Sequence, residues 1–119
     1  MEKLLEEALL YDFYGELLTT HQKEIYEDFV LNDLSLSEIA DERDISRQGV
    51  YDIVKRCRKQ LQGYEQKLHL VEKFLSAKKM AAQIDECAAA ILQHRDDQMY
   101  TAECVHKIRR FTNQIIGEL

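Results

Sequence analysis

Apolar residues recur every three or four positions along most of the chain, which is the spacing of one face of an α-helix. The pattern predicts a helix over residues 2–14 that stops at Gly15, and a second helix that starts after Thr19 and reaches about residue 31. Thr19 and Gln22 have the spacing of a capping box, in which each side chain accepts from the other residue's backbone amide. The residues expected to be buried are Leu4, Leu5, Ala8, Leu9, Tyr11 and Phe13 in the first helix, and Ile25, Tyr26, Phe29 and Val30 in the second.

The middle of the chain predicts two helices joined by a tight turn. Ser35 and Glu38 form another capping box, and Ala40 is small enough for a second helix to cross closely. Asp44 is expected to adopt the left-handed backbone conformation that helix-turn-helix units need in the turn, because Asp tolerates this conformation. Ser46 is the expected N-cap of the next helix. Together these signals predict a helix-turn-helix unit, with the preceding helix as its third member.

The second of these helices is expected to have a core face and a polar face. The core face consists of Val50, Ile53, Val54, Cys57 and Leu61. Such a helix can enter the DNA major groove, where side chains near its start meet base edges and later cations meet phosphates. The candidate nucleic-acid-binding residues are therefore Ser46, Arg47, Gln48, Tyr51, Lys55, Arg56, Arg58 and Lys59. The alternative is an ordinary three-helix core whose charged face is merely solvated.

Apolar positions continue after Gly63, a residue that could either break the helix or lie within it. A short heptad seam is predicted at Leu61, Tyr64, Leu68, Val71 and Leu75. Another stripe reaches about His94, and residues 95–97 form a polar break with an Asp as the next cap. The last helix, near residues 99–116, is expected to bury Met99, Ala102, Val105, Ile108, Phe111, Ile115 and Ile116. We expect a helical hairpin that packs on the N-terminal core, on a second subunit, or on both.

Composition supports an all-α fold, because the 119 residues include no Pro and only four Gly. Two parts are expected: residues 1–62 as the helix-turn-helix unit and residues 63–119 as a C-terminal helical extension that oligomerises. The three Cys are widely spaced and odd in number, which indicates free thiols in a reducing cytoplasm. No apolar run approaches the length of a membrane span.

Charge is distributed unevenly along the chain, whose net charge is −6. Residues 1–46 hold 13 acids and 3 bases, whereas residues 47–59 hold 5 bases and one acid, and residues 60–119 hold 8 of each. One helix thus concentrates positive charge on an acidic body. An acidic body repels the phosphate backbone, so duplex binding should be weaker and more strongly oriented than for a wholly basic domain.

The chain contains no combination of residues that indicates catalysis. Cys104 and His106 lie close in sequence, but no second pair of metal ligands accompanies them. The two Asp residues at 96 and 97 are expected to be solvated caps rather than cation ligands. There is no phosphate-binding Gly loop. We therefore expect a protein that is not an enzyme, with no cofactor and no metal site.

Three segments carry a resemblance to known proteins: LLYDFYGELLT at residues 9–19, LNDLSLSEIADERDISRQGVYDIVKR at residues 31–56 and YEQKLHLVEKF at residues 64–74. Together they resemble the YlxM family of small bacterial helix-turn-helix proteins. The central segment also resembles region 4 of bacterial sigma factors, which reads the −35 promoter element. The resemblance implies a sigma-region-4-like helix-turn-helix fold. It also implies a regulatory role, or an accessory role in the signal recognition particle pathway, since the family's gene lies beside that of the signal recognition particle GTPase.

Two functions from different classes follow. The first is sequence-specific DNA binding by a small transcriptional regulator, in which Arg47, Gln48 and Tyr51 face bases and the later cations neutralise phosphates. Asp52 opposes this function, because it lies on the same face and repels the backbone. The second is an adaptor that binds the signal recognition particle GTPase or its RNA. In either case we expect a homodimer that pairs through helices after Gly63.

Overall fold

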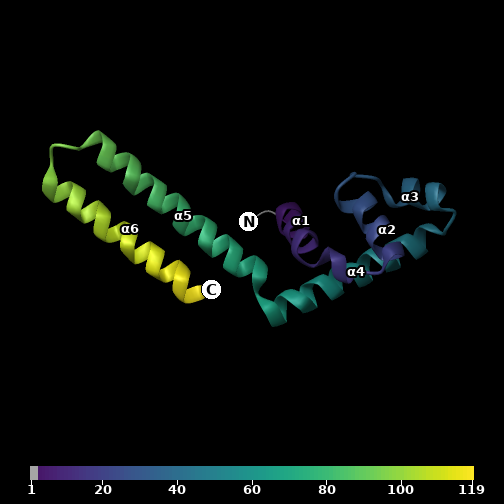
Figure 1. Cartoon of the computed structure of the whole chain (residues 1–119). Helices are drawn as coiled ribbons and strands as arrows, with labels where there is room; N and C mark the ends of the chain where they lie inside the picture. The colour runs from purple at the N-terminus through teal and green to yellow at the C-terminus, as the bar shows by residue number, and fades with distance from the viewer. Residues whose placement is uncertain (1–2) are drawn as a thin grey trace. The chain divides into compact units, whose positions relative to one another are not determined.

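The computed structural model describes residues 3–119, and its elements are all helical (Figure 1). They are α1 (Lys3–Tyr14), a short 3-10 helix η1 (Gly15–Leu17), α2 (Thr20–Val30), α3 (Leu36–Arg43), α4 (Arg47–Leu68), α5 (Leu70–Gln93) and α6 (Gln98–Glu118). This confirms the all-α prediction. No helix in the described range is long and apolar enough to cross a membrane.

The chain divides into two compact units, Met1–Val71 and Glu72–Leu119. The boundary expected from sequence, between residues 62 and 63, falls inside α4, which runs without interruption through Gly63. A Cβ atom at Gly63 would meet no atom within 4 Å, so close packing does not require a glycine there. Gly63 is therefore an ordinary helical position in an open part of the surface.

The first unit is built around α4, against which α1, α2 and α3 all pack. Its core contains Leu10, Tyr14, Ile25, Tyr26, Ile39, Val50, Val54, Cys57 and Leu61, each less than 5% exposed. The core face expected for α4 is largely correct, since only Ile53 is half-buried. On α2, Ile25 and Tyr26 are fully buried, while Phe29 and Val30 are half-buried.

The buried face of α1 agrees with the prediction only in part, since Tyr11 is buried as expected and Ala8 and Leu9 are half-buried. Leu5 is 52% exposed and Phe13 is 38% exposed, while the buried residues are Glu7, Leu10, Tyr11 and Tyr14. These four follow helical spacing, but Glu7, Leu10 and Tyr14 were not predicted, because a glutamate and a tyrosine interrupt the apolar pattern. The predicted start of the helix at Glu2 lies outside the described residues, and so does the side chain of Leu4.

The chain turns between α4 and α5 at His69, which adopts the left-handed conformation with φ 57°. The Tyr14 hydroxyl accepts from the Leu70 amide at 3.1 Å and donates to Glu65 Oε1 at 2.5 Å. The same Glu65 oxygen accepts from the Val71 amide at 2.9 Å. Two side chains therefore satisfy the first amides of α5, which would otherwise lack partners.

This turn corrects the predicted heptad seam. A continuous helix would have kept Leu61, Leu68 and Val71 on one face. Instead Leu61 and Val71 are buried, whereas Leu68, the last residue of α4, is 49% exposed. The prediction of one continuous seam is wrong. The apolar spacing alone predicts that the helix continues, but it ends where Tyr14 and Glu65 make their polar contacts.

The second unit is a hairpin in which α5 and α6 run antiparallel (Figure 1). Asp97 caps α6 by accepting from the Tyr100 amide at 3.0 Å, as predicted. At the open end, the Ser76 hydroxyl donates to Glu118 at 2.8 Å. The apolar stripes are far less buried within the chain than expected: among the predicted residues of α6, Met99, Val105 and Ile116 are 79%, 41% and 65% exposed.

Candidate nucleic-acid interface

The turn between α3 and α4 has the backbone geometry of a helix-turn-helix. Asp44 is in the left-handed region, with φ 54° and ψ 46°. Its amide and that of Ile45 both bond to the carbonyl of Ala40, which closes the end of α3. The cost of a left-handed residue is small for Asp, whose short polar side chain tolerates this conformation. The prediction for Asp44 is confirmed.

Side-chain caps fix where each helix of the pair begins. Ser35 and Glu38 form the predicted capping box, with both bonds at 3.1 Å. Ser46 accepts from the Gly49 amide at 2.9 Å. A Cβ atom at Gly49 would lie 3.0 Å from Ser46 Oγ, so the missing side chain leaves room for that cap. The start of α4, which carries the candidate base-contacting residues, is thereby held in place.

The two helices cross through a small buried contact. Ile39 is fully buried and Ala40 is 8% exposed, and Val50 of α4 is fully buried as well. Farther along α4, burial raises the pKa of the Cys57 thiol to about 11, so it stays protonated at neutral pH. Cys57 thus belongs to the core and is not a reactive thiol.

Most of the candidate residues lie on the open side of α4. Ser46, Arg47, Gln48, Tyr51, Lys55, Arg56 and Lys59 are all exposed. Arg47, Gln48 and Tyr51, together with Leu36 at the start of α3, line a shallow groove. Gln48 Nε2 donates to Asp52 Oδ1 at 3.0 Å, so part of the carboxylate of Asp52 is occupied by its neighbour.

Arg58 differs from the other candidates because it is engaged inside the first unit. Its Nε lies 2.6 Å from Oε1 of Glu7, whose side chain is only 9% exposed. Its guanidinium also lies over the ring of Phe29, 5.3 Å from the centroid. Arg58 therefore connects α4 to α1 and α2. The acids Glu6 and Glu7 share a surface hollow with Lys55, Arg58 and Lys59, and they lower the positive potential along that side of α4.

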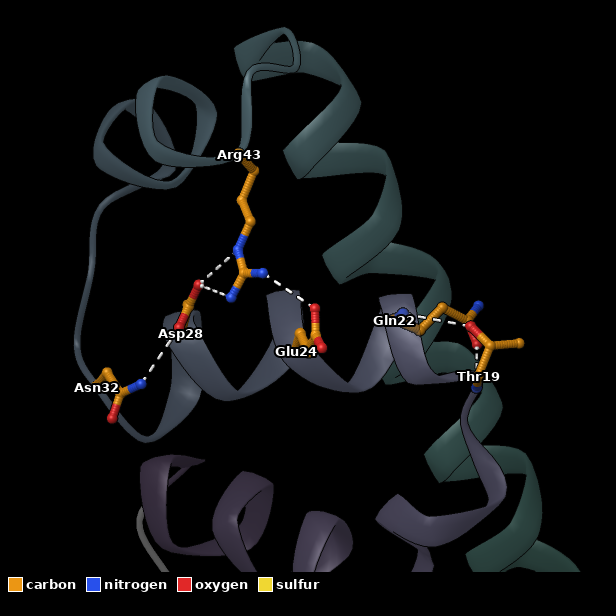
Figure 2. Close-up of polar contacts among 6 residues, drawn as sticks. All are labelled: Thr19, Gln22, Glu24, Asp28, Asn32 and Arg43. Carbon is orange, nitrogen blue, oxygen red and sulfur yellow. Dashed lines mark hydrogen bonds and ion pairs between the residues drawn. The ribbon is translucent and has the colours of Figure 1, made fainter.

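A second ion-pair group, which sequence reasoning missed, attaches α3 to α2 (Figure 2). Arg43 Nη2 lies 2.9 Å from Oδ2 of Asp28, which is 8% exposed, and Arg43 Nη1 lies 3.0 Å from Glu24. Asn32 donates to the other oxygen of Asp28 at 3.2 Å. The signal in the sequence was that Asp28 stands three positions after Ile25, on the buried side of α2. An acid at such a position implies a cationic partner.

Cys104 and His106 lie on different sides of α6. Cys104 is 6% exposed, whereas His106, two positions later on the helix, is exposed to solvent. Residues two apart point to opposite sides of a helix, so the thiol and the imidazole do not converge on one ion. The other two thiols, at Cys57 and Cys87, are likewise unpaired by disulfide bonds.

The fold and the exposed start of α4 define a helix-turn-helix protein. The chain belongs to the family described as "Putative helix-turn-helix protein, YlxM / p13 like", whose model matches residues 1–101. It is 55% identical over 80 residues to a UPF0122 protein of Caldanaerobacter subterraneus subsp. tengcongensis, a match that covers 67% of this chain and 68% of the relative. It is 41% identical over 108 residues to a UPF0122 protein of Bacillus velezensis, covering 91% and 97% of the two chains. The family is described by this fold and not by an enzymatic activity.

Proposed function

We propose that the chain is a sequence-specific DNA-binding regulator that inserts the start of α4 into the major groove. The observation that carries this proposal is the placement of Arg47, Gln48 and Tyr51. They are exposed on the first turns of a helix that is fixed by the left-handed turn at Asp44 and by the Ser46 cap. Residues at this position of a helix-turn-helix reach base edges.

The polar residues at the surface of α4 have three different roles in this proposal. Arg47 and Gln48 contact bases, since Arg suits guanine and Gln suits adenine. Lys55, Arg56 and Lys59 are exposed and neutralise phosphates, with Ser46 at the edge of the same surface. Arg58 keeps its ion pair with Glu7 and acts by holding α1 against α4. The number of cations left for phosphates is small, which predicts a shallow salt dependence.

The test is a titration of the protein against a duplex enriched from a random pool, run at two salt concentrations. Arg47→Ala should reduce the preference for that duplex over unrelated DNA by roughly tenfold, because a bidentate base contact is worth about 1–3 kcal/mol. Lys59→Ala should weaken all duplexes alike and lower the salt slope by about one unit. Lys78→Ala on α5 is the matched control. Equal affinity for all sequences, unaffected by Arg47→Ala, would contradict the proposal.

The second candidate is an adaptor that binds the signal recognition particle GTPase or its RNA. The acids of α1 favour the GTPase as the partner, because Glu6 and Glu7 beside Lys55 and Lys59 reduce the attraction of this side of α4 for any phosphate backbone. The same titration, repeated with that RNA and that GTPase, separates the two functions. Binding to either one with no selectivity among DNA duplexes would favour the adaptor.

Either function suits a cytoplasmic homodimer, which is the third part of the proposal. The small buried core of the second unit supports it, since only Met80 and Cys104 of that unit are less than 9% exposed. A symmetric pair would carry two helix-turn-helix units for neighbouring half-sites.

A further inference from the structure

We propose that the hairpin pairs with a second copy of this chain through one particular face, and that the pair forms a four-helix bundle. The inference rests on the proposed homodimer and adds the surface, the symmetry and the contacts. The face consists of two stripes, called here the pairing face: Phe74, Ala81, Ala88 and Leu92 on α5, with Val105, Thr112 and Ile116 on α6.

The stripe on α5 has the spacing of a coiled-coil seam. Phe74, Ala81 and Ala88 are seven residues apart, and Leu92 follows four residues later. All four are exposed, Phe74 by 41% and Leu92 by 64%. The two alanines between the larger residues would let another helix approach closely. From Ala81 to Leu92 the apolar spacing continues on an exposed face, which is typical of a helix that packs on a further element.

The stripe on α6 repeats the arrangement of the α5 stripe. Val105 and Ile116 are 41% and 65% exposed. Thr112 lies between them, and its hydroxyl donates to the carbonyl of Ile108 at 2.9 Å. Because that hydroxyl is already bonded within its own helix, the methyl group of Thr112 can enter an apolar contact at little cost.

Both stripes lie on the same side of the hairpin. On α5, Ala81 and Ala88 come one and eight positions after the buried Met80; on α6, Val105 and Thr112 come one and eight positions after the buried Cys104. Each stripe is therefore rotated by about 80–100° from the buried side of its helix, in the same sense. In an antiparallel pair, equal rotations turn toward the same side.

The stripes are also in register along the hairpin. The Ser76–Glu118 hydrogen bond places those two residues level with each other. Because the helices are antiparallel, each residue further along α5 lies level with one residue earlier on α6. Ala81 therefore lies beside Thr112, and Ala88 lies beside Val105, to within one residue. The pairing face is continuous across both helices.

A second copy fits this face by size and by charge. Phe74 to Leu92 spans about 27 Å of helix, and two packed helices are about 20 Å wide, so the face covers on the order of 500–600 Å² in projection. A stable interface buries about 800 Å² of accessible surface per partner. Accessible surface is larger than projected area because it follows every side chain, so this face reaches that size when nearly all of it is covered. Two hairpins that lay these faces together complete a four-helix bundle.

Charge at the edge of the face indicates which two-fold arrangement forms. Asp85 lies five positions after Met80, and Arg109 lies five positions after Cys104, so they occupy the matching outer edges of α5 and α6. Both are exposed, and counting from the Ser76–Glu118 bond places them level. With a two-fold axis parallel to the helices, α5 of one copy lies over α6 of the other. Asp85 of each copy then meets Arg109 of the other.

The test is sedimentation of the full chain over a wide concentration range, with matched alanine variants. The wild type should be a dimer. Ala81→Glu with Ala88→Glu should weaken dimerisation by about a hundredfold or more, because the dimer would bury four carboxylates. Ala82→Glu with Ala89→Glu is the control, since these exposed neighbours point away from the pairing face, and it should stay within threefold of wild type. Helix content by circular dichroism should match in all three.

A charge exchange tests the symmetry. Asp85→Arg and Arg109→Asp should each weaken the dimer by about tenfold through two repulsive contacts, and the double variant should recover most of the loss. Singles that weaken the dimer without recovery in the double variant would overturn this two-fold arrangement. A wild-type monomer, or a dimer untouched by Glu at 81 and 88, would overturn the pairing face. A monomer that still selects DNA sequences would leave the DNA-binding proposal standing.

Discussion

The two units of the chain have similar helical content but very different interiors. The first unit buries residues from every one of its helices and fastens them with specific polar contacts such as Arg43–Asp28, Arg58–Glu7 and Tyr14–Glu65. The second unit buries Met80 and Cys104 and leaves large apolar side chains at the surface. The first unit therefore has a packed interior, whereas the second leaves a large part of its apolar surface exposed.

This difference also shows which structural features the apolar pattern alone can predict. Spacing identified helices in both units, but it could not distinguish a face that packs within the chain from one that packs on another molecule. Val50 and Ile116 both sit on predicted apolar stripes, yet Val50 is fully buried and Ile116 is 65% exposed. Burial depends on how many neighbouring elements pack against a helix, and the sequence of that helix alone does not show this.

The largest expected effect compares the same substitution in the two units. Ala40→Glu places a charge where α3 and α4 cross, so it should cost at least about 3 kcal/mol and unfold much of the protein. Ala82→Glu, on the exposed side of α5, should change stability by less than about 0.5 kcal/mol. Urea unfolding followed by circular dichroism measures both. Equal midpoints for the two variants would mean that α3 and α4 do not pack as described.

A smaller effect is expected at the turn between α4 and α5. Tyr14→Phe removes the hydroxyl that bonds to Glu65 and to the Leu70 amide, and it should destabilise the protein by about 1–2 kcal/mol. Tyr51→Phe provides the control, since the Tyr51 ring is 46% exposed at the surface of α4, and its midpoint should remain near wild type. Thermal melting compares them. A loss of stability only in Tyr51→Phe would contradict the role given to Tyr14.

Local signals in the sequence were sufficient for the helix-turn-helix and insufficient for the contacts around it. Ser35, Asp44, Ser46 and Asp97 act within a few residues of themselves, so their caps and turns could be predicted from spacing. Arg58 could not, because the partner that occupies it comes from α1, 51 positions earlier. Its surface role was inferred from α4 alone. The turn at His69 was missed for the same reason, since Tyr14 is distant in sequence.

The smallest expected effect concerns pH and the core of the first unit. Burial raises the pKa of the Cys57 thiol to about 11, from an ordinary value near 9. In the unfolded chain the thiol loses its proton from about pH 9 upward, while in the folded chain it stays protonated. The unfolded state is therefore favoured as pH rises, and stability that is complete below pH 9 declines by about 1 kcal/mol between pH 9 and pH 10.

The measurement is the free energy of unfolding at intervals between pH 8 and pH 10, below the range where the buried tyrosines contribute most. The pKa of Tyr26 is also raised by burial, to about 12, so its own effect begins only near the ordinary tyrosine value of 10. Cys57→Ala should be less stable overall but should flatten the slope between pH 9 and pH 10. A slope in Cys57→Ala equal to that of the wild type would contradict the burial of this thiol in the core of the first unit.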